Sequence, residues 1–101
     1  MRITKEFNRL YHGCFLKDLY DQMMHKRCLA MSFEKFKQAI KYANKHYPRY
    51  NNTNDTVSTK DIRSKDLVYH LEWIRKYAAG YGFTLTIDDE AWERMMQLAH
   101  Q

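Results

Sequence analysis

The chain has 101 residues with a formal net charge of +5 at pH 7, and 45% of its residues are hydrophobic. A chain of this length folds as one domain around one core, and its short apolar runs exclude a membrane span, which needs about 20 apolar residues. The first residues also lack the apolar stretch of a signal peptide, so we expect a cytoplasmic protein, in the host cytoplasm if a phage encodes it.

The positive charge is confined to one half of the sequence. Residues 1–50 contain 11 Lys and Arg against 4 Asp and Glu, a balance of +7, whereas residues 51–101 contain 6 against 8, a balance of −2. Such an asymmetry indicates an anionic partner, and nucleic acid is the commonest partner of a small basic domain.

The N-terminal residues show a helical pattern that changes phase. Up to Gly13 the apolar residues share one helical stripe, and after it they lie on nearly the opposite side. We therefore predict a helix over about residues 4–12 and a second over about residues 14–28, joined by a kink at His12 and Gly13. The alternative is one long helix that is buried on two sides.

The next segment predicts an amphipathic helix over residues 33–47. Ser32 precedes it as an N-cap, and Pro48 stops it because the residue before proline disfavours the α conformation. Its predicted core stripe consists of Phe33, Phe36, Ile40, Ala43 and Tyr47. Residues 49–63 are rich in Asn, Thr and Asp and show no apolar periodicity, so we expect a polar, mobile loop there.

The fourth predicted helix begins at a Ser64 cap and ends at Gly80 or Gly82. Its predicted core residues are Leu67, Leu71, Ile74 and Ala78. Residues 83–87 then form a short extended segment, which either pairs with residues 56–59 or runs alone.

The last predicted helix is capped by Thr86 or Asp88. Its expected core residues are Trp92, Met95, Met96 and Ala99. The fold class predicted from these elements is mainly α, a compact bundle of four to five helices in a single domain over residues 1–101.

The helix over residues 33–47 carries a basic face beside its core stripe. Lysines at this spacing can follow a phosphate backbone, and a tyrosine among them can stack on a base. The alternative is an ordinary solvated face, because lysine favours helices without any partner. The candidate nucleic-acid-binding residues are Lys35, Lys37, Gln38, Lys41, Tyr42 and Lys45 on this helix and Arg49, Lys60 and Arg63 beyond it.

The short connection before this helix allows a second interpretation of the same face. In a helix-turn-helix, the basic second helix would enter the major groove of DNA. Short turns also join neighbouring helices in ordinary bundles, so the connection does not distinguish the two. The side chains that would face the groove are Ser32, Lys35, Gln38 and Tyr42.

An aromatic ridge follows the fourth helix, where Tyr69, Trp73 and Tyr77 stand four residues apart. Such a ridge is a second buried face if the helix packs between two neighbours. Otherwise it is a protein interface, because Trp and Tyr are enriched at the energetic centres of interfaces.

Two cysteines and two histidines near the N-terminus are residue types that bind zinc. Along a helix, Cys14 and His25 lie about 16 Å apart, so they cannot share one ion. Cys14 and Cys28 lie about 21 Å apart, too far for a disulfide, and we expect buried free thiols. No metal ion and no cofactor are predicted.

No catalytic motif accompanies the basic helix. The isolated His46, His70 and His100 are expected to be packing or surface residues, and the acidic residues at positions 88–93 are explained by the start of a helix, where the dipole favours them. The sequence has no Gly-rich phosphate loop and no paired-acid motif. We therefore predict a non-enzymatic protein.

The last third of the chain runs from a helix through Gly80-Tyr81-Gly82-Phe83, a short apolar stretch and an acidic cap into the final helix. This order loosely resembles the tail of phage recombination-mediator proteins. It contains no functional motif, so no site residue or activity is carried over. Together with the small size and basic charge, the resemblance suggests a phage or mobile-element accessory protein.

Our leading hypothesis is a small nucleic-acid-binding accessory protein that contacts DNA or RNA phosphates through the helix over residues 33–47. The alternative is a protein-binding inhibitor or adaptor, such as a phage factor that targets a host enzyme or defence complex. In that case the lysines would meet an acidic protein surface, and the aromatic ridge would anchor the contact. A membrane partner is not expected, and a homo-oligomer stays open.

Overall fold

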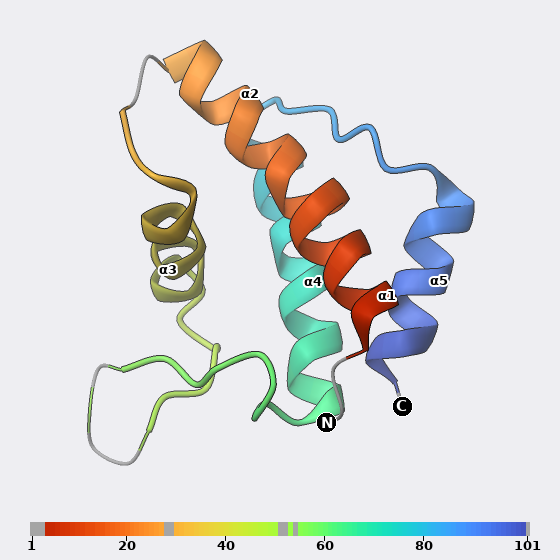
Figure 1. Ribbon diagram of the computed structural model, residues 1–101. Coiled ribbons are helices and arrows are strands. Elements are labelled where there is room, and N and C mark those ends of the chain that lie inside the picture. Colours follow the sequence, from red (N-terminus) through yellow and green to blue (C-terminus); the bar gives the residue numbers. More distant parts are fainter. Residues whose placement is uncertain (1–3, 28–29, 51–52, 54, 101) are drawn as a thin grey trace.

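The computed structural model describes residues 4–27, 30–50, 53 and 55–100, and these form four helices (Figure 1). The first helix, over residues 5–27, lies in front of α4 (Ser64–Gly80) in Figure 1, with α3 (Phe33–Ala43) on one side of it and α5 (Asp89–Ala99) on the other. Within the described residues there is no strand, which confirms the predicted mainly α bundle. The elements are α1 (Lys5–Asn8), η1 (Arg9–Leu16) and α2 (Lys17–Arg27), which form the first helix, then α3 (Phe33–Ala43), α4 (Ser64–Gly80) and α5 (Asp89–Ala99).

The first helix is continuous because its middle part, η1, is a π-helix. A π-helix has i→i+5 hydrogen bonds and therefore a wider turn, so each turn takes up more residues than an α-helical turn. The wider turn brings the apolar residues before and after Gly13 onto the same side of the helix. Phe7, Phe15 and Leu19 are therefore all fully buried in one core. The prediction of two helices joined by a kink at His12 and Gly13 is therefore wrong, and a single helix forms instead.

Helix α3 begins where predicted and ends early. The Lys35 N–H donates to the Ser32 hydroxyl at 3.2 Å, which confirms the cap. The helix stops at Ala43 rather than at Tyr47, because Asn44 leaves the helical conformation (φ −84°, ψ 100°) and its side-chain oxygen accepts a hydrogen bond from the His46 N–H at 3.1 Å. Ala43, predicted in the core, is exposed, and Asn44 is fully buried beside it.

Helix α4 buries all four predicted core residues, whereas its two ends differ from the prediction in detail. Arg63 occupies the N-cap position and Ser64 is the first helical residue, so the predicted cap is one position out. At the other end, Gly82 has a φ of +79° in the left-handed region. Its N–H donates to Ala79 at 3.1 Å and the Phe83 N–H donates to Ala78 at 2.9 Å, the pattern of a Schellman motif.

The segment between α4 and α5 runs extended along the first helix. The Asp18 carboxylate accepts hydrogen bonds from the Thr86 N–H at 2.7 Å and the Thr86 hydroxyl at 3.1 Å, and Gln22 donates to the Thr84 carbonyl at 2.8 Å. The segment therefore runs alone rather than pairing with residues 56–59. Asp88 then caps α5, because its carboxylate accepts from the Ala91 N–H at 2.7 Å, as predicted.

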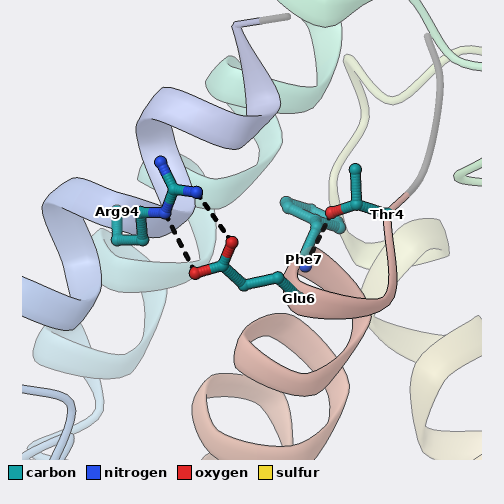
Figure 2. Close-up of polar contacts among 4 residues, drawn as sticks. All are labelled: Thr4, Glu6, Phe7 and Arg94. Carbon is teal, nitrogen blue, oxygen red and sulfur yellow. Dashed lines mark hydrogen bonds and ion pairs between the residues drawn. The ribbon is translucent and has the colours of Figure 1, made fainter.

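An ion pair links α1 to α5. The Glu6 carboxylate accepts two hydrogen bonds from the Arg94 guanidinium, at 3.0 Å from Nε and 2.7 Å from Nη2 (Figure 2). Beside this pair, the Thr4 hydroxyl accepts from the Phe7 N–H at 3.0 Å and caps the first helix. These contacts join α1 to α5 across nearly the whole length of the sequence.

Candidate nucleic-acid interface

The predicted basic face of α3 is divided into an exposed part and a half-buried part. Lys37 and Lys41 are half-buried on the flank next to the core. The side chains that are exposed on the far side of the helix, or just past its end, are Lys35, Gln38, Tyr42 and Lys45. The candidate residues therefore do not form one uniformly solvated row.

The two half-buried lysines contact groups of the protein itself. The Lys37 ammonium lies 2.8 Å from a Glu34 carboxylate oxygen and 5.3 Å from the centroid of the Phe33 ring. The Lys41 ammonium lies 5.5 Å from the centroid of the Tyr47 ring, and burial, assisted by the charge of Lys37, lowers the pKa of Lys41. These two charges are thus partly engaged inside the fold.

Arg49 and Tyr42 form a fixed pair on the exposed part. The Arg49 guanidinium carbon lies 5.3 Å from the centroid of the Tyr42 ring, and its nitrogens donate to the carbonyls of Tyr47 at 3.2 Å and Tyr42 at 3.3 Å. The Tyr42 side chain is 47% exposed. A guanidinium held over an aromatic ring is a cation–π contact. Because Arg49 is half-buried in this contact, the exposed part of the Tyr42 ring is the surface on which a base can stack.

The segment over residues 49–63 is held against α3 where the structure describes it. The Thr56 hydroxyl donates to the Gln38 side-chain oxygen at 3.1 Å, and the Tyr47 hydroxyl donates to the Val57 carbonyl at 2.6 Å. Arg49 and Thr56 form an antiparallel bridge. Lys60 and Arg63 are exposed farther along. The sequence pattern gave no sign of these contacts, nor of Ile62, which is 1% exposed in the core.

A buried polar pair fixes the end of α3 to α4. Asn44 and His70 are both fully buried, and the Asn44 amide nitrogen lies 2.9 Å from His70 Nδ1. Because the Asn44 oxygen accepts from the His46 N–H, its amide nitrogen is the donor, which assigns the His70 proton to Nε2. Burial, with the nearby Lys41 charge, lowers the pKa of His70 to about 3. His70 is therefore a neutral packing residue at neutral pH.

The aromatic ridge is neither fully buried nor fully exposed. Tyr69 is 47% exposed, whereas Trp73 and Tyr77 are half-buried and pack against the core. The Trp73 and Tyr77 rings stack with their centroids 4.9 Å apart, and the Tyr81 ring lies tilted against Tyr77 at 4.8 Å. The ridge also begins next to the end of the α3 surface, because the His46 and Tyr69 rings lie 5.7 Å apart. The sequence pattern does not indicate that these two surfaces meet.

The cysteine prediction is corrected by the structure. Cys14 is exposed rather than buried, because it lies on the outer side of the π-helical segment, and Cys28 lies outside the described residues. Across the described parts of the chain, no three His, Cys, Asp or Glu side chains gather so that they could hold a metal ion. None of the helices described above combines the length and apolar character needed to cross a membrane.

Comparison of the chain with protein-family models, with curated proteins and with solved structures found no match. The function is therefore inferred from the residues and their geometry.

Proposed function

We propose that this is a non-enzymatic nucleic-acid-binding protein that contacts phosphates through the exposed side of α3 and the adjoining segment over residues 49–63. The charge distribution supports this, because the excess of basic residues lies in the half of the sequence that contains α3. Among the described residues, no carboxylate lies within ion-pair distance of the exposed cations of this surface, Lys35, Lys45, Lys60 and Arg63.

The observation that carries the proposal is the Tyr42–Arg49 pair among these exposed cations. Nucleic-acid sites combine cations that follow the backbone with aromatic or guanidinium planes that stack on bases. Here both kinds of group lie on one surface, and two carbonyl hydrogen bonds hold the guanidinium in place. The geometry also selects the lysines to test, because Lys35 and Lys45 are exposed whereas Lys37 and Lys41 are half-buried.

The test measures binding of labelled single-stranded and duplex DNA and RNA by the wild type and by the K35E/K45E variant. We expect the double charge reversal to weaken binding of every nucleic acid, because phosphate contacts carry no sequence information. K5E/K26E is the control with the same change in net charge, since Lys5 and Lys26 are exposed on the first helix. Equal binding by K35E/K45E and the wild type would contradict the proposal.

A second candidate function is binding to a protein partner, as an inhibitor or adaptor. The observation that favours it is the row of neighbouring rings of Trp73, Tyr77 and Tyr81, with Tyr81 52% exposed, because aromatic side chains of this kind anchor interfaces. A pull-down from nuclease-treated lysate distinguishes the two. A stoichiometric protein that is retained after nuclease treatment, and lost in a Trp73→Ala variant, favours the adaptor. The phage or mobile-element origin stays a prediction.

A further inference from the structure

An open hollow of about 470 Å³ lies between the segment that follows α3 and the beginning of α4. It is lined by His46, Lys65, Asp66 and Tyr69. The His46 and Tyr69 rings meet edge to face, with an interplanar angle of 77°, so that they form two walls at a steep angle to each other. Asn44 fixes this corner, because it holds the backbone of His46 on one side and the ring of His70 in α4 on the other.

The lining combines the groups that a nucleotide needs. A half-exposed tyrosine ring offers a flat face for stacking, and a carboxylate accepts hydrogen bonds from the amino group of a base. An ammonium group on the same rim attracts a phosphate. The volume lies within the range of about 300–1,000 Å³ that is usual for small-molecule sites. The Asp66 carboxylate repels an acidic group inside the hollow, so a phosphate is favoured at Lys65 and the neutral base beside Asp66.

We propose that this hollow receives an unpaired nucleobase, so that the nucleic acid bound by the protein is single-stranded. The inference rests on the proposed function. The base stacks on Tyr69 and its exocyclic amino group donates to Asp66, while Lys65 contacts the adjoining phosphate. In a duplex the bases are stacked and paired, and the face that Tyr69 would contact is covered.

The hollow lies next to the exposed basic side chains at the end of α3, which also supports the binding of a single strand. Lys45 is exposed and directly precedes His46, so the phosphate-binding side of α3 leads into the hollow. Tyr42, in α3, lies four residues before His46 in the sequence and is as exposed as Tyr69, at 47%. A single strand that follows Lys35 and Lys45 would thus pass two aromatic platforms, which is the arrangement that binds single strands without strong sequence preference.

The experiment compares a single-stranded oligonucleotide with its duplex, for the full chain and for Y69A, Y69F and Y81A. Alanine at position 69 should weaken single-strand binding roughly 5- to 100-fold, as loss of a stacked base does, whereas phenylalanine should retain it. Y81A is the matched control, because Tyr81 is also a half-exposed tyrosine at the other end of α4. Circular dichroism verifies that each variant is folded.

A second measurement locates the base directly. A single-stranded oligonucleotide that contains 5-iododeoxyuridine is irradiated in the complex, and the cross-linked peptide is identified by mass spectrometry. Cross-linking to Tyr69 or to its tryptic peptide supports the inference. If duplex and single strand bind equally and Y69A matches the wild type, the hollow is not a base site, although phosphate binding by α3 still stands. If no nucleic acid binds the wild type at low salt, both proposals fail.

Discussion

The guanidinium of Arg49 lies over the ring of Tyr42, 5.3 Å from its centroid, and joins the segment that follows α3 to the exposed side of the helix. The pair is fixed by hydrogen bonds from Arg49 to the carbonyls of Tyr42 and Tyr47. The basic surface therefore contains an aromatic ring that is held in a fixed position. Single substitutions at this pair and at the other contacts should change the stability of the protein as follows.

Substitution of Arg49 by lysine separates the charge from the geometry. Lysine keeps the positive charge but lacks the planar fork that reaches two carbonyls, so we expect a loss of about 1 kcal/mol in the free energy of unfolding. Urea denaturation measures this loss. Arg63→Lys, an exposed arginine at the other end of the same segment, should change stability by less than about 0.5 kcal/mol. Equal effects of the two substitutions would show that the Arg49 hydrogen bonds contribute nothing.

Asn44→Ala should destabilise the protein by about 1–3 kcal/mol, because it leaves the buried His70 Nδ1 and the part-buried His46 N–H without their partner. Urea denaturation of the variant checks this value. Asn8→Ala serves as the control, since Asn8 is an exposed asparagine in the first helix. An unchanged unfolding midpoint for Asn44→Ala would contradict the role of this pair in fixing α3 to α4.

Acid should destabilise the fold through His70. The pKa of His70 is about 3 in the folded protein, against the ordinary histidine value of 6.5, so below pH 6.5 the unfolded chain binds a proton that the folded chain does not. Stability is therefore highest above pH 6.5 and falls as the pH decreases toward 3, with a slope that approaches about 1.4 kcal/mol per pH unit. Burial also lowers the pKa of His12, and this acts in the same direction.

Urea denaturation at pH 7, 6 and 5 measures this slope, and His70→Gln should reduce it. The lowered pKa values of the Glu6 and Glu34 carboxyls act at lower pH, below the ordinary glutamate value of 4.5, so this range reports on the histidines. An NMR titration that shows the His70 ring taking up a proton between pH 7 and 5 in the folded protein would contradict the assignment.

Substitution by alanine should change the stability of the protein in opposite directions at the two glycines at the end of α4. Neither an alanine at position 80 nor one at position 82 would meet another atom within 4 Å, so only the backbone differs. Gly80 is helical, and Gly80→Ala should stabilise by about 0.5–1 kcal/mol. Gly82 has a φ of +79°, and Gly82→Ala should destabilise by about 1–2 kcal/mol. Thermal unfolding of both variants decides this, and a shift of the same sign in both would refute the explanation.

The caps and the helical stripes could be predicted from the sequence because they depend on neighbouring residues. Ser32 and Asp88 act within three residues of their own positions, and both are confirmed as caps. The π-helical segment could not be predicted in this way. A change of apolar phase is compatible both with a kink and with a wider turn, and the structure contains the wider turn.

The candidate site was predictable in composition but not in arrangement. The sequence indicated which side of α3 is basic, yet the half-burial of Lys37 and Lys41 depends on the Phe33 and Tyr47 rings. The early end of α3 depends on Asn44 and its partner His70, which are far apart in the sequence. The contact between the His46 and Tyr69 rings depends on this early end of the helix. The hollow between α3 and α4 could therefore be found in the structure alone.

The most direct test of phosphate binding by α3 is the salt dependence of single-strand affinity for the wild type and K35E/K45E. Each phosphate contact lowers the logarithm of affinity by about 0.7 per decade of salt for a single strand. We predict that the logarithm of the wild-type affinity decreases linearly with the logarithm of the salt concentration, with a slope that is smaller by roughly two contacts in the variant. An affinity that does not change with salt, or the same slope in both proteins, would contradict phosphate binding by α3.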